Sequence, residues 1–264
     1  MFVTIINDCK DANAMGRQST RAASLFKCSV ATLGIDSYKD LEGAGNIIDM
    51  LDAADGDEGV IMVNIAPRHG RGKKWPNGTP FGYFWYNKTL VVSTVDGTTL
   101  SLAKKFGLID TFYLTDLPTV MEKMTEMGYF SSESLERVKK TQFRSFDYMP
   151  RLAKWVKDGI SVPFEEYSVE QISDAPKAVW WVDNFGNCKT TILPEEIGFE
   201  PGKQLESKIG PLQCYERLKD VPNDDTALIV GSSGFQEKRF LEVIIQGKNA
   251  AQTLGLQSGS VLFD

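Results

Sequence analysis

Apolar residues are grouped in blocks through the first part of the chain, and these blocks predict alternating strands and helices. An apolar, β-branched run at 2–6 ends in an Asn-Asp pair, which is typical of a buried strand closed by a turn. Residues 13–33 and 40–54 predict helices, and the run at 59–67 predicts a second buried strand. The order favours an α/β domain with a central, mostly parallel sheet.

The middle of the chain predicts a hairpin and then several helices. The hairpin pairs 83–86 with 89–94, with Asn87-Lys88 as its turn. A short strand is expected at 112–114. Helices are expected on both sides of it, at 98–106, 117–128, 131–140 and 150–157.

The pattern changes after residue 160. Residues 161–178 have no clear periodicity and contain prolines, so we expect a linker between an α/β domain at 1–160 and a second domain at 179–264. Short apolar runs broken by glycine and proline predict an all-β, barrel-like second domain. Its strands are expected at 179–183, 188–193, 203–209, 226–230 and 240–245.

Composition narrows the possible functions. The net charge of −6 over 264 residues argues against a general nucleic-acid binder. The four cysteines are scattered and there is one histidine, so we expect free thiols and no metal site. No apolar run reaches the ~18 residues of a membrane span, and the first residues do not resemble a signal peptide. We therefore expect a cytoplasmic protein that does not contact membranes.

The most informative segment is the turn Asp183-Asn184-Phe185-Gly186-Asn187 between two expected strands. It brings a carboxylate, an aromatic ring and an amide together, which suits a ligand with an ammonium, a flat heterocycle and hydrogen-bonding edges. The alternative is an ordinary hairpin turn that contains an aspartate. A second segment, Gly231-Ser232-Ser233-Gly234, lies near the C-terminus and is followed by the run FLEVIIQGKNAA.

The order of these motifs resembles the S-adenosylmethionine hydroxide adenosyltransferases, the family that includes the fluorinases and chlorinases. Asp8 and Asp11 precede a helix, the strand VNIAP leads into a glycine-rich basic loop, and Phe143–Asp147 resembles a Phe-His-Gly-Arg-Asp run. Asp183–Asn187 matches the family's Asp-x-Phe-Gly-Asn signature in full. The resemblance implies an α/β domain followed by a barrel-like domain, in a homotrimer whose ligand lies between neighbouring subunits.

The resemblance also implies a reaction and its substrate-binding residues. The family displaces methionine from C5′ of S-adenosylmethionine, with water giving adenosine, and no separate cofactor is implied. Asp8 would hold the ribose hydroxyls, with Asp11 beside it, unless Asp8 only closes a turn. In the second domain, Asp183 would bind the methionine ammonium, Phe185 would pack on adenine and Asn187 would bind its edge. Ser232 and Ser233 would meet the methionine carboxylate, unless they form a plain Ser-Gly turn. The backbone around Ala250 would contact adenine, unless it only starts a helix.

The catalytic positions match less well. The hydrolases of the family resemble one another in an Asp, Arg and His set near the attacking water; here Ala66 and Arg144 occupy the Asp and His positions. Arg71, Lys73 or Lys74 would supply the arginine, and His69 is a candidate substitute unless it is a solvated loop residue. Ser145 matches a fluorinase serine beside the halide, or it caps a helix.

Three functions therefore remain open. The first is cleavage of S-adenosylmethionine by water, or by another nucleophile such as halide. The second is a catalytically degenerate protein that binds S-adenosylmethionine or a nucleoside. The third is RNA or phosphate binding through the basic loop RHGRGKKW, which could equally be a solvated loop; the acidic total charge counts against this function.

Overall fold

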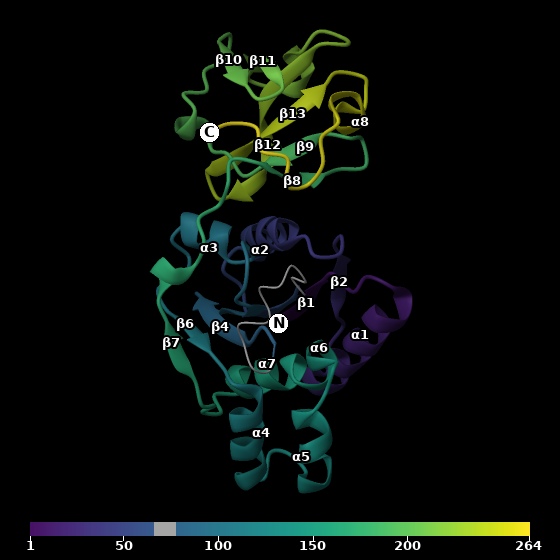
Figure 1. Cartoon of the computed structure of the whole chain (residues 1–264), viewed down its shortest axis with the longest axis vertical. Helices are drawn as coiled ribbons and strands as arrows, with labels where there is room; N and C mark the ends of the chain where they lie inside the picture. The colour runs from purple at the N-terminus through teal and green to yellow at the C-terminus, as the bar shows by residue number, and fades with distance from the viewer. Residues whose placement is uncertain (66–77) are drawn as a thin grey trace.

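A computed structural model describes residues 1–65 and 78–264. It contains two β-sheets, one in each half of the chain, with most of the helices packed around the first sheet (Figure 1). The first half is α/β and the second is all-β apart from short helical segments, so the predicted fold class is confirmed. Among the described residues, no helix has the length and apolar character needed to cross a membrane.

The first sheet has seven strands in the order β2-β1-β3-β5-β4-β6-β7. Its parallel strands are β2 (Ala31–Gly34), β1 (Phe2–Asn7), β3 (Gly59–Asn64) and β5 (Thr89–Thr94). The antiparallel strands are β4 (Phe81–Tyr86), β6 (Phe112–Leu114) and β7 (Glu165–Tyr167). The predicted hairpin is confirmed as β4 and β5, which are joined at Asn87-Lys88.

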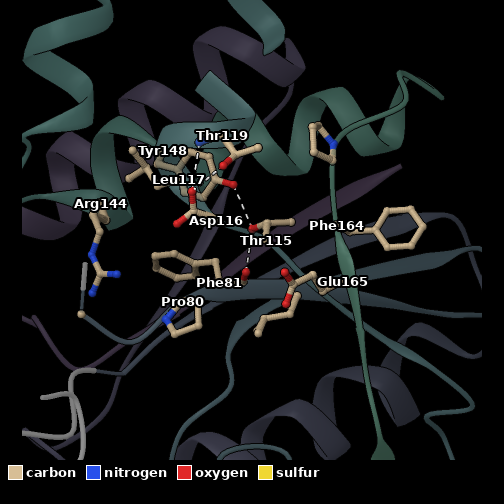
Figure 2. Close-up of a pocket in the computed structure, with 13 residues that line it drawn as sticks. Pro80, Phe81, Thr115, Asp116, Leu117, Thr119, Arg144, Tyr148, Phe164 and Glu165 are labelled. Atoms are coloured by element: carbon tan, nitrogen blue, oxygen red, sulfur yellow. Dashed lines mark hydrogen bonds between the residues drawn. The ribbon is translucent and has the colours of Figure 1, made fainter. Parts of the chain in front are cut away.

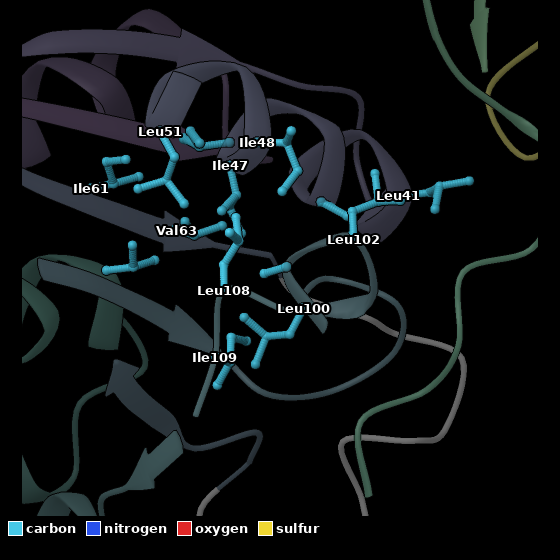
Figure 3. Packing of buried hydrophobic residues seen from close by; sticks show 14 of the residues in the cluster. Leu41, Ile47, Ile48, Leu51, Ile61, Val63, Leu100, Leu102, Leu108 and Ile109 are labelled. Carbon is cyan, nitrogen blue, oxygen red and sulfur yellow. The ribbon is translucent and has the colours of Figure 1, made fainter. Parts of the chain in front are cut away.

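Helices cover both faces of this sheet, and β3 shows how the sequence directs them. Ile61 and Val63 share one core with α2 (Asp40–Ala54) and α3 (Ser101–Lys105), as Figure 3 shows. Their neighbours Val60 and Met62 face a second core, because successive side chains of a strand point to opposite faces. That second face is covered by α1 (Ala12–Phe26), α4 (Leu117–Glu126) and α7 (Met149–Lys157), with α5 (Ser132–Lys139) and α6 (Arg144–Asp147) beside them.

The second sheet has six strands in the order β10-β11-β12-β13-β9-β8. Their bounds are β8 (Val179–Val182), β9 (Cys188–Thr190), β10 (Gln204–Ser207), β11 (Gly210–Tyr215), β12 (Thr226–Phe235) and β13 (Lys238–Ile245). The helix α8 (Ala250–Leu254) follows. A core of its own on this sheet includes Val179, Leu228 and Leu241, whereas Trp180, Phe235 and Phe240 belong to the core around α2.

Several elements differ from the sequence expectation. The helix expected at 13–33 ends at Phe26, where Lys27 takes a left-handed conformation with φ of 56°. The β-branched segment after it forms strand β2 beside β1. Strand β11 was missed, and β12 runs on to Phe235 through a bulge between Val230 and Gly234. The segment expected as a linker includes β7, which extends the first sheet; the domain boundaries themselves stay a prediction.

Helix α2 lies between the two sheets and packs on β8 and β12 (Figure 1). The ring of Trp180, which is 1% exposed, joins the core that α2 shares with the first sheet. It lies against Gly45 so closely that a Cβ on Gly45 would be 2.1 Å from the Trp180 Cε3 atom. Glycine at 45 therefore allows the close approach of α2 to the second sheet.

This contact predicts opposite effects for matched glycine substitutions in two helices. Gly45→Ala should lower the free energy of unfolding by ~1–3 kcal/mol, because the buried ring must move. Gly16→Ala in α1 should raise it by roughly 0.5–1 kcal/mol, because nothing lies within 4 Å of a Cβ there. Urea unfolding of both variants measures the difference. Equal stability of the two variants would contradict the packing of Trp180 on Gly45.

Candidate functional site

The turn between β8 and β9 is held together by the carboxylate of Asp183. Asp183 Oδ1 accepts hydrogen bonds from the backbone N–H groups of Phe185 and Asn187, each at 2.9 Å. Asp183 Oδ2 accepts one from Asn187 Nδ2 at 3.0 Å. A carboxylate has about four acceptor positions, so one position on Oδ2 is left for a further donor. Asp183 thus stabilises its own turn and can also bind a cation.

The same turn is fixed against α8. Gly186 has φ of +86°, and a Cβ there would lie 2.2 Å from Asn249 Cγ, so glycine meets both a left-handed backbone and a close approach. The carbonyl of Gly186 accepts a hydrogen bond from Ala251 N at 2.9 Å. The Asn249 side chain caps α8 by accepting from Gln252 N at 2.7 Å. The structure therefore brings the 183–187 turn and the backbone around Ala250 together. Their predicted contacts with a ligand stay a prediction.

Phe185 is at the surface. Its side chain is among the most exposed large apolar groups of the described chain, with 70% of its surface exposed. The chain turns inward directly after it, since Asn187 is half-buried and Cys188 is fully buried. A phenyl ring held on a rigid turn offers a flat apolar face to a ligand or to another subunit.

The two serines before Gly234 have different environments. Ser232 is exposed, and its carbonyl accepts a hydrogen bond from Arg239 Nη1 at 3.3 Å. Ser233 is buried, and its hydroxyl donates to Asp49 Oδ2 at 2.9 Å and accepts from Lys189 Nζ at 2.7 Å. The Ser233 hydroxyl therefore links α2 to the second sheet. Its predicted contact with a methionine carboxylate stays a prediction.

Two buried carboxylates accompany this link. Burial raises the pKa of Asp49 above its ordinary value, and its hydrogen bond from Ser233 and the charge of Lys189 offset the rise only in part. Burial likewise raises the pKa of Glu242, which Lys189 partly offsets. Among the described residues, Glu242 Oε1 has no hydrogen-bond partner. The ionised form of Glu242 is therefore disfavoured in the folded protein.

In the first half, polar side chains gather where the parallel strands β1 and β3 end. The buried amides of Asn7 and Asn64 form a hydrogen bond of 2.8 Å between these strands. The next residue, Asp8, is 4% exposed, and its Oδ2 accepts from Tyr38 N at 3.3 Å. Ligands of α/β sheets commonly bind at this edge. Asp8 thus lies at this edge of the sheet, and its predicted contact with a ribose stays a prediction.

Asp11 and Ser145 lie on neighbouring helices. Asp11 is the N-cap of α1, and its side chain accepts from Ala14 N at 2.9 Å. Ser145 lies within α6 and does not cap a helix; its hydroxyl accepts from Gln18 Nε2 at 3.2 Å. Asp8, Asp11 and Ser145 are thus in the α/β half, whereas Asp183, Phe185, Asn187 and Ala250 belong to the β half.

Arg144 borders a pocket of about 440 Å³ at the start of β4 and the end of β6 (Figure 2). Its Nη1 donates to the carbonyl of Thr79 at 2.6 Å, and its guanidinium lies 5.9 Å from the centre of the Phe81 ring. Burial lowers the pKa of Arg144. The pocket also contains Thr115, whose hydroxyl is 2.8 Å from that of Tyr148.

The remaining catalytic candidates, His69, Arg71, Lys73 and Lys74, lie outside the described residues, as does Ala66 at the family's aspartate position. Within the described ranges, no group of three His, Cys, Asp or Glu side chains is placed to hold a metal ion. The sequence analysis missed the Asn7–Asn64 pair and the contacts of Asp49 across the two sheets. A polar residue at the end of a buried strand was the available signal for the first. No sequence signal pointed to the contacts of Asp49, because they depend on packing between distant segments.

The α/β half thus has buried polar groups at its strand ends, and the β half has a turn ordered by the Asp183 carboxylate. Residues 177–263 match the family model described as the SAM hydroxide adenosyltransferase C-terminal domain. This match places residues 177–263 in the SAM hydroxide adenosyltransferase family and supports the resemblance found in the motifs. The match includes the 183–187 turn, both serines and α8.

Solved structures extend the similarity to the whole fold. An uncharacterized conserved protein from Thermotoga maritima is 14% identical, with a TM-score of 0.67 over 99% of both chains. A conserved hypothetical protein from Thermus thermophilus is 17% identical, with a TM-score of 0.65 over 100% of this chain and 99% of its own. Comparison with curated protein sequences gave no match. At these identities, the likeness shows the fold alone.

The buried Glu242 predicts a pH-dependent effect of its removal. Because burial raises its pKa when folded, the folded protein binds more protons than the unfolded chain between the ordinary and the raised pKa. The contribution of Glu242 to stability therefore falls as pH rises through that interval. Glu242→Gln should be more stable than the parent at neutral pH.

This advantage should shrink as the pH is lowered to the ordinary pKa of a glutamate, which is about 4.3. Urea unfolding at neutral and acidic pH measures the change. Glu237→Gln, at an exposed position, is the control and should alter stability little at either pH. A Glu242→Gln advantage that does not vary with pH would contradict the assignment.

Proposed function

We propose that this protein cleaves S-adenosylmethionine by nucleophilic displacement at the ribose C5′, with water or hydroxide giving adenosine and methionine. The observation that carries the proposal is the match of residues 177–263 to the family's C-terminal domain, with the Asp-x-Phe-Gly-Asn turn intact. The family is one of adenosyltransferases that act on S-adenosylmethionine; the choice of nucleophile is our proposal.

The geometry of the turn supports binding of the methionine end. Asp183 uses its carboxylate for three hydrogen bonds within the turn and keeps one acceptor position on Oδ2. An ammonium at that position would form a charge-assisted hydrogen bond with an acceptor that is already oriented. Because the turn holds Asp183 in place, little side-chain entropy would be lost on binding.

Two observations support a site shared between subunits of a homotrimer. Phe185 is exposed on a rigid turn, so its ring is available to pack on adenine or on a neighbouring subunit. Asp8 directly follows β1, at the edge of the first sheet where its parallel strands end, in the other half of the chain. A ligand held by the Asp8 edge of one subunit and the 183–187 turn of the next would use both features.

The reaction needs little from the protein beyond alignment. The C5′–S bond breaks as the C5′–O bond forms, the electron pair goes to sulfur to give the neutral thioether of methionine, and attacking water loses a proton. Bringing the nucleophile into line with sulfur and removing its water shell lower the barrier. Arg144 cannot accept the proton, because an arginine side chain stays protonated in proteins. It could act only by attracting an anionic nucleophile such as hydroxide.

Two alternatives follow from the substitutions at the family's catalytic positions. With Ala66 and Arg144 in place of the acid and the imidazole, the protein could bind S-adenosylmethionine or a nucleoside without turning it over. It could also use another anionic nucleophile, such as halide. Loss of one acid–base group commonly lowers a rate by about 10²–10⁴-fold.

Product analysis separates these functions. Purified protein is incubated with S-adenosylmethionine, with and without chloride, and the products are separated by chromatography. Adenosine plus methionine is the expected result, and a 5′-chloro nucleoside that appears only with chloride would instead show halogenation. Calorimetric binding without any product would support the binding protein, and no binding would refute both functions.

A substitution at Asp183 tests the assigned contact. Asp183→Asn should weaken S-adenosylmethionine binding by about tenfold or more, because a hydrogen bond between charged groups is lost, and should weaken adenosine binding less. Asp220→Asn, an exposed position in the same half of the chain, is the control and should bind as the parent does. Calorimetry gives both affinities. Equal losses for the two ligands would show that Asp183 only stabilises the turn.

Mixed oligomers test the shared site. Asp8→Ala and Asp183→Asn variants should each be weakly active alone, and a refolded mixture should regain activity. If each site takes one residue from each of two subunits, random mixing restores about a quarter of the sites. Turnover of the mixture, compared with the sum of the separate variants, measures this. No gain on mixing, with mixed oligomers shown to form, would refute a site shared between subunits.

A further inference from the structure

Arg144, which lines the pocket, forms no ion pair with another described residue. Burial lowers the pKa of Arg144, and the nearby Tyr148 offsets this only in part. Among the described residues, the guanidinium donates a hydrogen bond to a neutral carbonyl, that of Thr79, and its charge is not met by a carboxylate in an ion pair. A half-buried cation without a carboxylate favours an anion nearby.

The position of the guanidinium is set by its surroundings. The guanidinium lies close to the backbone of Gly78, since a Cβ there would be 2.8 Å from Arg144 Nη2. One of the five N–H donors of a guanidinium is used by Thr79 at 2.6 Å. In Figure 2 the group lies at one side of the pocket, beside Phe81 and Pro80. Its remaining donors can bind a planar acceptor at two points.

Two acidic residues, Asp116 and Glu165, also line the pocket. Asp116 caps α4, and its Oδ2 accepts from the backbone N–H and the hydroxyl of Thr119, at 3.1 and 2.7 Å. Glu165 is exposed at the edge of the pocket, where water screens its charge. Arg144 is the one cation among the described lining residues, so a ligand with a single negative charge fits better than a phosphate dianion.

The other walls indicate the body of the ligand. Pro80, Phe81, Leu117, Tyr148 and Pro163 present apolar surface to the pocket. The volume of about 440 Å³ is at the small end of the range for ligand sites. We propose that this pocket binds a small organic carboxylate, with its carboxylate on Arg144 and its apolar body against Phe81 and Tyr148. This inference does not depend on S-adenosylmethionine cleavage.

Binding of a matched pair of probes to the full chain tests the proposal without S-adenosylmethionine. Ligand-observed NMR titrations compare 3-phenylpropanoate with 3-phenylpropanamide, which has the same shape and no charge. We expect the acid to bind at least about tenfold more tightly than the amide, because it forms charge-assisted hydrogen bonds. Inorganic phosphate should not displace the acid. Equal affinity of the two probes, no binding of either, or displacement by phosphate would overturn the proposal.

Substitutions then locate the site. Arg144→Gln should weaken binding of 3-phenylpropanoate at least about tenfold, and Arg144→Lys should keep part of the affinity, because the charge remains but the two-point contact is lost. Arg217→Gln, at an exposed position in the β half, removes the same charge and should change nothing. Thermal unfolding checks that each variant is folded. If Arg144→Gln does not fold, Arg144→Lys decides: unchanged affinity in that variant would overturn the site.

Discussion

The arrangement of the whole molecule depends on the burial of α2 between two sheets. One side of this helix packs on the parallel strands, and Gly45 lets the ring of Trp180 approach from the other. Asp49 and Asp52, on the same helix, accept hydrogen bonds from the backbone of Gly234 and Gln236 at 3.2 and 2.7 Å. Because packed helices and sheets do not deform continuously, this contact fixes the second sheet relative to the first.

The contact between α2 and the second sheet contains buried charged groups, whose loss of hydration costs free energy. Ionised Asp49 and Glu242 are both disfavoured by burial, and Lys189 lies 3.9 Å from the first of them. Apolar residues would avoid the loss of hydration, so the charged set is a poor source of stability. It does give the two sheets one register, because Ser233 and Lys189 find their partners in a single arrangement.

The two halves contribute different chemistry. The β half supplies a turn whose aspartate is already oriented, and the α/β half supplies buried polar groups at a strand edge. These sets lie in different halves of the chain, which agrees with a ligand bound between subunits as we propose. The Arg144 pocket adds a separate cationic position along the same edge of the sheet. It lies beside β4 and β6, and β4 is three strands from β1 in the sheet order. The resemblance predicts a histidine at this position, whereas the chain has Arg144, which stays positively charged.

The sequence by itself determined the elements whose causes are local. Alternating apolar residues predicted the α/β half, the β4–β5 hairpin and the all-β half, and the Asp-x-Phe-Gly-Asn turn identified the family, because spacing and turn chemistry act over a few residues. Strand β2 escaped prediction because a left-handed Lys27, and pairing with β1, decided where the helix ended. The tertiary structure alone decided that Ser233 faces Asp49 and that Arg144 borders a pocket. Those contacts join segments more than sixty residues apart, and no local pattern records which distant surfaces will meet.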